Sequence, residues 1–540
     1  MFDKNKAIEK TADKKERLNN NIYKQTEIDK TAVHIWKKYA TGDSESTLLK
    51  YALDNENLKI EDVCSGIKVC NYKEAIKTDD NSWIDEFGAV IRIYREMSDS
   101  VLSNIDNKSI AQISLLPFAR YIQKRIAALY SSLLERISGE AVKEYSYFIL
   151  GQLAFIAEDT LQTCARCFAN SLEISFWRQR PVNEQGICFL SWFYSDGISQ
   201  MFNTYPLVIK KLMNTVKRHY INFYSFISGF NQDIGLISKK FGVLPNGLII
   251  KHLSGNLSDP HNGGKTVMRL ELSSGDVIYY KPRSMAVDNA WARFTDRLNR
   301  SGFPTRLYAP EVLDMGSYGY MQEITYHSAV SEDEMKEYYT NAGGLCCVVA
   351  MLGGSDFHHE NIIAHGTVPV LIDVETIITP KPAPLYGLTG VTQNEGASTH
   401  VGRTLMLQRW VGESPISARD IGGFTSEQIT EKNIPDVKKG AEYYINEFIS
   451  GYSRAYDFFL SRKHAILQEG WLNDFAGCQF RYVFRRTALY YSLIKHFYSA
   501  AFMRDILYFE GAISRFGAGI LLNFDKTDAK KLWNLVLEEK

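Results

Sequence analysis

The residues best suited to chemistry lie between positions 353 and 375, in the run GGSDFHHENIIAHGTVPVLIDVE. Asp356 and Asn361 are five residues apart, which is the spacing of Asp and Asn in the catalytic loop of protein kinases. Asp373 follows twelve residues after Asn361, at the end of an apolar segment, where kinases place a metal-binding Asp. Phosphoryl transfer needs a carboxylate beside the attacking hydroxyl and oxygen ligands for magnesium. The pattern therefore predicts a phosphotransferase in which Asp356 acts at the hydroxyl and Asn361 and Asp373 bind magnesium.

Two other interpretations of this segment stay open. A transition-metal site could be built from His358, His359, Asp373 and Glu375. Two neighbouring histidines on one loop cannot easily face the same ion, however, and no thiolate joins them. Alternatively, the segment is a polar loop closed by hydrogen bonds, although several polar groups just outside two strand ends favour a site.

A second signal lies upstream, where a hairpin is predicted. Lys281, within the motif YYKPR, ends its second strand, and Gly263-Gly264 precede its first strand. A glycine loop lets backbone N–H groups approach phosphate oxygens, and a lysine on a sheet can hold nucleotide phosphates. Each feature alone is weak evidence, and no Walker A sequence is present. The order of glycine loop, lysine hairpin, catalytic loop and metal-binding hairpin is nevertheless that of a kinase fold.

These residues must be positioned by a mixed α+β architecture. The amphipathic spacing before Gly247 predicts a large helical region, whose aromatic side chains are expected to pack in the core. Beyond it the sequence predicts, in order, a hairpin at 266–281, a helix at 286–300, a strand at 318–324, a helix at 334–354, strands at 361–366 and 368–378, and helices from 437 onward. The corresponding domain prediction is a polar N-terminal segment at 1–80, a helical region at 81–245 and a catalytic region at 246–540 with a mobile segment at about 379–435.

Composition excludes several classes of protein. Lys+Arg and Asp+Glu both number 62 in 540 residues, so no bulk basic field for nucleic acid exists. No run approaches the ~20 apolar residues that a membrane span needs. The N-terminus lacks the apolar core of a secretory signal, so a cytoplasmic protein is expected. The eight cysteines suggest no disulfide framework, and the C-x-x-C of Cys164 and Cys167 is more typical of buried thiols than of a zinc site.

The motifs SDPHNGG, YYKPR, GGSDFHHENII, LIDVET and FRYVFRRTALYY together resemble the dehydratase domain of class II lanthipeptide synthetases, the LanM type. The resemblance covers most of residues 80–540. It implies a catalytic core similar in fold to lipid kinases, preceded by a large helical N-terminal region. It also implies lantibiotic biosynthesis. Ser and Thr of a ribosomal precursor peptide, made of leader and core, would be phosphorylated with ATP and Mg²⁺, and the phosphate would then be eliminated to leave dehydroalanine or dehydrobutyrine.

The resemblance assigns roles to particular residues. Lys281, with Gly263 and Gly264, would contact ATP. His358 would assist Asp356 at the substrate hydroxyl, and the magnesium ligands would be Asn361, Asp373 and Glu375.

Further residues match the family's elimination machinery. Arg481 and Thr487 correspond to the pair that acts on the leaving phosphate, which suits an Arg fork and a hydroxyl donor. Asp259 and His261 match another functional pair and are expected in the active site, without a step assigned to them. The family often has Asn at the position of Ser254, whereas the nearest Asn here is Asn256.

Full LanM-type synthetases also carry a C-terminal cyclase domain with a zinc site of two Cys and one His. The only cysteine beyond position 347 is Cys478, and no Cys-His-Gly motif follows. We therefore expect the cyclase to be missing from these 540 residues, either by truncation or because a separate protein supplies it. Two rival functions remain, namely a kinase-like phosphotransferase that does not eliminate phosphate and a scaffold that only binds the leader peptide.

Overall fold

The computed structural model describes most of the chain between positions 82 and 513. The described residues are 82–101, 109–172, 181–255, 263–379, 439–481 and 487–506, with shorter stretches at Ala7, Leu257, 400–408, 410–411, 419–425, 432–436, 508–509 and 512–513. The chain divides into two units, Met1–Leu134 with Val142–Ile227 and Arg486–Lys540, and Glu135–Ala141 with Ser228–Arg485. The described residues that follow Arg486 thus group with the helical unit, and the domain ranges expected from sequence remain predictions.

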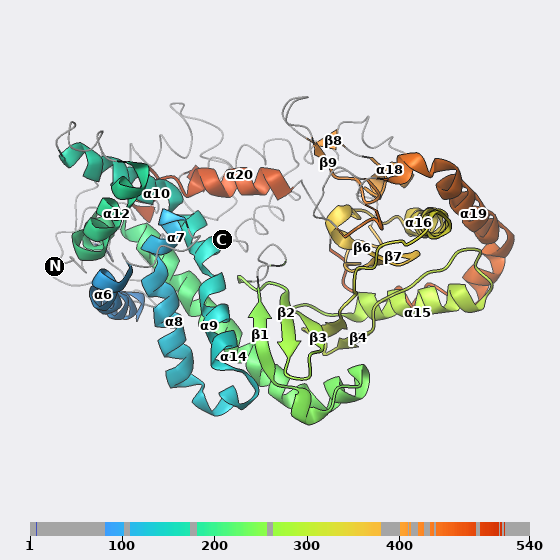
Figure 1. Cartoon of the computed structure of the whole chain (residues 1–540), viewed down its shortest axis with the longest axis horizontal. Helices are drawn as coiled ribbons and strands as arrows, with labels where there is room; N and C mark the ends of the chain where they lie inside the picture. Colours follow the sequence, from blue (N-terminus) through green and yellow to red (C-terminus); the bar gives the residue numbers. More distant parts are fainter. Residues whose placement is uncertain are drawn as a thin grey trace, which may run out of the picture. The chain divides into compact units, whose positions relative to one another are not determined.

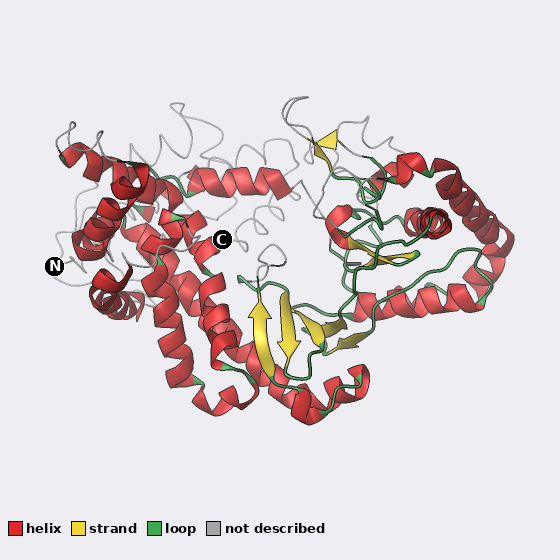
Figure 2. Ribbon diagram, viewed as in Figure 1, coloured by secondary structure: helices red, strands yellow, loops and turns green. Residues whose placement is uncertain are grey.

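The first unit is helical in its described part, as the amphipathic spacing predicts (Figure 2). Its helices are α6 (Ser82–Val101), α7 (Ile110–Ser114), α8 (Leu116–Leu129), α10 (Leu150–Ser171), α12 (Val182–Trp192), α13 (Ile198–Thr204) and α20 (Thr487–Phe497). Helices α9 (Gly139–Phe148) and α14 (Pro206–Phe241) run from one unit into the other. Aromatic side chains fill this core, where the rings of Phe87 and Phe202 stack with their centroids 5.2 Å apart. The expected aromatic core is therefore confirmed.

The second unit contains a five-stranded antiparallel sheet, drawn as yellow arrows in Figure 2. Its strands are β1 (Ile250–Ser254), β2 (Met268–Leu272), β3 (Val277–Lys281), β4 (Val312–Asp314) and β5 (Gly319–Gln322), in the order β1-β2-β3-β5-β4. In β2 the residues Met268, Leu270 and Leu272 are buried and alternate with half-buried polar residues. Strands β2 and β3 form the predicted hairpin, whose turn includes Gly275 at a φ of 92°. The α+β class is thereby confirmed.

The bounds of two long helices of this unit follow from local features of the sequence. Helix α15 spans Ala286–Arg300, the range that the sequence predicts. Helix α16 spans Glu332–Leu352, and the side chain of Ser331 caps its start by accepting the N–H of Glu334. It ends at Gly353, which adopts the left-handed conformation with a φ of 77°. The loop that carries the predicted catalytic residues begins there.

The hairpin after this loop is shorter than the sequence predicts. Strand β6 spans Ile362–His365 and β7 spans Val368–Leu371, and Ile362 pairs with Leu371 at the open end. The residues before β6 form the 3-10 turn His359–Asn361 in place of an extended strand. Beyond Leu371 the segment therefore has no strand to pair with, and β7 does not continue to residue 378. Asp373 and Glu375 therefore lie in the segment that follows the strand.

The core of the second unit is built around α16, which packs against α19 (Ile445–Gln468) and the β6–β7 hairpin (Figure 1). Apolar side chains of α15 belong to the same core. Close approach of α16 and α19 depends on two glycines. A Cβ built on Gly343 would lie 1.9 Å from the carbonyl oxygen of Phe448, and one on Gly451 would lie 1.9 Å from that of Thr340. The two helices thus pack backbone to backbone.

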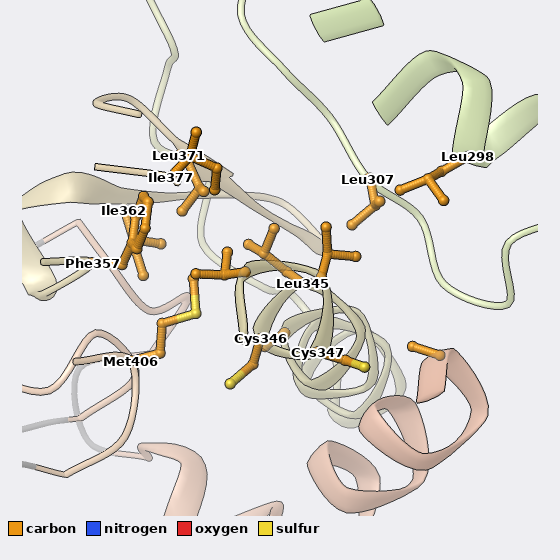
Figure 3. Close-up of a cluster of buried hydrophobic side chains, with 14 of the residues drawn as sticks. Leu298, Leu307, Leu345, Cys346, Cys347, Phe357, Ile362, Leu371, Ile377 and Met406 are labelled. Carbon is orange, nitrogen blue, oxygen red and sulfur yellow. The ribbon is translucent and has the colours of Figure 1, made fainter. Parts of the chain in front are cut away.

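Several loops also contribute to this core. Figure 3 shows Phe357, Ile362, Leu371 and Ile377 gathered beside the turn of α16 that carries Leu345. Met406 also belongs to it, and with Phe424 it comes from the segment 379–435 that the sequence predicts to be mobile. The described pieces of that segment, α18 (His400–Arg403), β8 (Trp410–Val411), β9 (Arg419–Asp420) and adjoining residues, thus include buried side chains.

Among the described residues, no helix combines the length and the apolar character that crossing a membrane requires.

Candidate functional site

The loop after α16 holds Asp356 in an unusual backbone conformation. Its φ is 67°, in the left-handed region that Asp and Asn enter more readily than most residues. The side-chain amide of Asn361 donates to the carbonyl oxygen of Asp356 at 2.7 Å. The N–H of Ser355 donates to the carbonyl of Thr376 at 3.1 Å, and the Thr376 hydroxyl donates back to the carbonyl of Ser355. These bonds tie the loop both to β6 and to the segment that carries Asp373 and Glu375.

His358 lies beside Asp356, as the resemblance implies. Its Nε2 is 3.9 Å from Asp356 Oδ1, and its Nδ1 accepts the N–H of Glu360 at 3.3 Å. Asn361 ends the short 3-10 turn His359–Asn361 and passes directly into β6. Its carbonyl accepts the N–H of Ile372 at 3.1 Å, which fixes the start of the segment that leads to Asp373.

Arg283 joins the two acidic residues of this segment. Its guanidinium Nη2 lies 3.1 Å from Asp373 Oδ1, and its Nε lies 3.4 Å from Glu375 Oε2. The other edge of the guanidinium binds Asp288, with Nη1 at 2.6 Å from one carboxylate oxygen and Nη2 at 3.3 Å from the other. Three carboxylates therefore surround one arginine.

Lys281, at the end of β3, is only 4% exposed. Its ammonium donates to the carbonyl oxygen of Ile372, the residue before Asp373. Burial lowers the pKa of Lys281, because a dry environment disfavours the charged form, while the charge of Asp373 acts in the opposite direction. The predicted phosphate-binding lysine and the predicted metal-binding acid are therefore neighbours.

Arg481, near the C-terminal end of the second unit's sequence, also contacts the acidic residues of this site. Its N–H donates to the carbonyl of Glu375 at 2.9 Å, and its Nη1 lies 3.5 Å from Glu375 Oε1. The positive charge of Arg481 acts to lower the pKa of Asp356, Asp373 and Glu375. The structure thus brings together residues that are up to 200 positions apart in the sequence.

The three acids of the site differ in their ionisation. Burial and the charge of Asp373 raise the pKa of Glu375, and burial likewise raises the pKa of Asp356. Burial would also raise the pKa of Asp373, but the charges of Lys281 and Arg283 outweigh it and hold the pKa below its usual value. The site therefore concentrates negative charge that further cations could stabilise.

Two predicted site residues, Asp259 and His261, lie outside the described residues, as does Asn256. Thr487 is the first residue of α20, in the helical unit, and its side chain is not among those described.

Both residues of the predicted glycine loop adopt backbone conformations that favour glycine. Gly263 and Gly264 have φ values of 81° and 85°, which residues with a Cβ rarely adopt. They turn the chain just before β2, in the unit that carries Lys281.

The alternative of a transition-metal site receives no support. Within the described ranges, no group of three or more His, Cys, Asp or Glu side chains is placed to hold a metal ion. The ring Nδ1 of His359 instead lies 3.2 Å from the carbonyl of Ile421. Cys164 is buried but Cys167 is exposed, so the buried-thiol interpretation is correct for Cys164 and wrong for Cys167.

Sequence reasoning missed Arg283 and Asp288. Arg283 stands two residues after Lys281 within the motif YYKPR, and that proximity is the signal that could have drawn attention to it. Asp288 gives no such signal, because an acid in the first turn of a helix such as α15 is common on electrostatic grounds alone.

Comparison with known families adds to this geometry. A family model described as "Domain of unknown function (DUF4135)" matches residues 205–441 and 425–540. The chain belongs to this family. The DUF4135 domain is found in LanM-type lantibiotic synthetases, so the chain is LanM-like. That agrees with the resemblance seen in the motifs.

One curated relative of this DUF4135 chain is the lacticin 481/lactococcin biosynthesis protein LcnDR2 of Lactococcus lactis subsp. lactis. The two are 23% identical over 343 residues, which is 55% of this chain and 36% of the relative. The matched part thus spans about a third of that protein's length. The relationship is distant and connects the chain with lantibiotic biosynthesis in general terms.

Proposed function

We propose that this chain is a peptide Ser/Thr dehydratase of lantibiotic biosynthesis with a kinase-like catalytic core. It phosphorylates Ser and Thr of a precursor peptide and then eliminates the phosphate. One observation carries the proposal. Arg481, the candidate elimination residue, binds Glu375 within the same cluster as Asp356, Asp373 and Lys281, the candidate phosphorylation residues. A protein that only transfers phosphate has no need of an arginine for the second step.

The residues present suit magnesium and ATP as cofactors. Asp356, Asp373 and Glu375 lie close enough that the charge of Asp373 raises the pKa of the other two, so a divalent cation would relieve their repulsion. No three of the described acidic side chains are placed to hold a metal ion by themselves, so Asn361, Asp373 and Glu375 would hold magnesium together with oxygens of the nucleotide phosphates and water. Lys281, and the backbone of Gly263 and Gly264, would contact the nucleotide phosphates. When bound, magnesium–ATP supplies the phosphoryl group and offsets its negative charge.

In the first step the chain's own residues orient the peptide hydroxyl. Asp356 would accept the hydroxyl proton as the bond from the peptide oxygen to the terminal phosphorus of ATP forms and the bond from that phosphorus to ADP breaks. Its raised pKa suits a group that must take up a proton. His358, with its Nε2 3.9 Å from that carboxylate, keeps it oriented. The hydrogen bond from the Asn361 amide to the Asp356 carbonyl supports the loop that carries both side chains.

In the second step the peptide loses its α-proton to a base, and the electron pair forms the double bond as the carbon–oxygen bond to phosphate breaks. The leaving phosphate gains negative charge, which the planar guanidinium of Arg481 stabilises. Thr487 would donate a further hydrogen bond. Asp259 and His261 belong to this active site in our proposal, without a fixed step.

The substrate would be a ribosomal precursor with leader and core parts, and the reaction would take place in the cytoplasm, where ATP and the new peptide are available. Ring closure would fall to a cyclase outside these 540 residues.

The test is to co-express the chain with a candidate precursor and to measure the intact peptide mass. A dehydratase removes ~18 Da per modified residue, whereas a phosphotransferase that stops after the first step adds ~80 Da. An unchanged mass, in the presence of demonstrated peptide binding, would favour a leader-binding scaffold and contradict the proposal. The same expression with Asp356→Asn is the control for modification by host enzymes.

A further inference from the structure

We propose that Arg283 and Asp288 form a positioning pair that holds Asp373 and Glu375 in the arrangement that binds the metal ion. This inference rests on the proposed function, because it concerns how the same site binds magnesium. Neither residue needs to touch the metal or the substrate. Arg283 acts through the two carboxylates that it binds, and Asp288 acts through Arg283.

The geometry leaves Arg283 little freedom. All three guanidinium nitrogens are engaged, with Nη1 on Asp288, Nη2 shared between Asp288 and Asp373, and Nε on Glu375. The side chain of Arg283 is 19% exposed and that of Asp288 is 6% exposed, so solvent screens these contacts weakly. The planar fork therefore fixes the distance between the two acids of the site as well as their orientation.

Asp288 gives the arrangement a rigid anchor. It is the third residue of α15, whose neighbouring side chains Val287 and Trp291 are in the core of the unit. Asp373 and Glu375, in contrast, lie in the irregular segment after β7. The ion pair between Asp288 and Arg283 thus connects a packed helix to a segment that has no strand pairing to hold it in place.

This role differs from that of a simple counter-ion. A lysine at position 283 would keep the positive charge but would present one compact ammonium in place of a fork, so it could not span three carboxylates in a fixed plane. If Arg283 only neutralised charge, Arg283→Lys would leave metal binding nearly unchanged. If it positions the acids, the substitution weakens metal binding although the net charge stays the same.

The experiment measures the binding of ATP to the full chain by titration calorimetry at a series of Mg²⁺ concentrations, for the unaltered protein, Arg283→Lys and Asp288→Asn. Loss of a group that orients metal ligands typically weakens metal affinity about 10–100-fold, and we expect a shift of the Mg²⁺ dependence in that range for both variants. Arg300→Lys and Asp296→Asn are matched controls, because this pair on α15 is 2.9 Å apart but its side chains are 79% and 54% exposed. The controls should retain the unaltered Mg²⁺ dependence.

Circular dichroism and the thermal midpoint establish that each variant is folded. Asp288→Asn is nearly isosteric, so it decides the question if Arg283→Lys does not fold. A folded Asp288→Asn protein with the unaltered Mg²⁺ dependence overturns the positioning role. Absence of Mg²⁺-dependent ATP binding in the unaltered protein would instead contradict the proposed function itself, which keeps the two failures distinct.

Discussion

Arg481 is bound to Glu375 through both its main chain and its side chain. The main-chain hydrogen bond is 2.9 Å long, and the guanidinium lies 3.5 Å from the Glu375 carboxylate. The residue that motif comparison associates with phosphate elimination thus has the residue associated with magnesium as its direct partner. A single site would then serve both steps, and the phosphopeptide would not need to travel between two centres.

The first prediction concerns Asp356→Asn. We expect no modification of the peptide and an unchanged fold, because Asn has nearly the same shape, tolerates the φ of 67° and lacks only the proton-accepting carboxylate. Intact peptide mass and the thermal midpoint of the protein are the measurements. Asp356→Ala is a poorer test, because Ala adopts the left-handed conformation of this residue less readily, so a change in the backbone could also lower activity. Dehydration at a rate near that of the unaltered protein would exclude Asp356 as the acceptor.

The second prediction separates the two chemical steps. Arg481→Met and Thr487→Ala should still consume ATP but accumulate phosphopeptide, seen as gains of ~80 Da, because stabilisation of the leaving phosphate is lost. The removal of one such donor typically lowers the rate by about 10²–10³-fold. Time-resolved mass spectrometry of the peptide provides the measurement.

Arg462→Met on α19 is a suitable control, because Arg462 is exposed and lies on a helix that carries none of the site residues. Unmodified peptide in both the Arg481 and Thr487 variants would place these residues in the first step or in folding.

The third prediction concerns acid stability. His219 is fully buried against Tyr145, with ring centroids 4.2 Å apart, and burial lowers its pKa to about 4. The unfolded chain binds a proton near pH 6.5 and the folded chain does not, so stability is present above pH 6.5 and is lost as the pH falls toward 4. The loss should reach about 3 kcal/mol. His219→Gln should remove this pH dependence.

The free energy of unfolding, measured by urea denaturation at about pH 7, 5.5 and 4.5, would check this loss. These values cover the range over which such a histidine titrates. His464→Gln is the matched control, because His464 is exposed. Equal pH dependence of His219→Gln and the unaltered protein would contradict the assignment.

The fourth prediction concerns the contact of α16 with α19. Gly343→Ala should destabilise the protein by about 1–3 kcal/mol or more, because the new methyl group would meet the backbone of Phe448 and force the helices apart. Gly235→Ala is the control, since Gly235 is helical and a Cβ there meets nothing within 4 Å. That change should raise stability by up to about 1 kcal/mol. Thermal unfolding distinguishes the two outcomes, and equal midpoints would show that the helices can separate at little cost.

Local signals in the sequence predicted α15, α16 and the strands β2, β3 and β5 of the second unit, but not the strands β1 and β4. The period of the apolar residues predicts α15, and Gly353 marks the end of α16, because helix amphipathicity and left-handed glycine caps depend on neighbouring residues alone. The length of β7 was not predictable in this way. The end of β7 depends on where its partner β6 begins, because Leu371 pairs with Ile362. The apolar residues after Leu371 continue to Ile378, so the sequence itself shows no end at Leu371.

For the candidate site, the sequence predicts a set of residues and their order, namely Lys281, Asp356, Asn361, Asp373 and Glu375, and their roles stay predictions. The folded chain adds that Arg283 binds Asp373 and Glu375 and that Arg481 binds Glu375, which no sequence pattern indicates. The reason is physical. Spacing along the chain reports on contacts within a helix or hairpin, whereas ion pairs between residues some 90 or more positions apart depend on how α15, α16 and the sheet pack together.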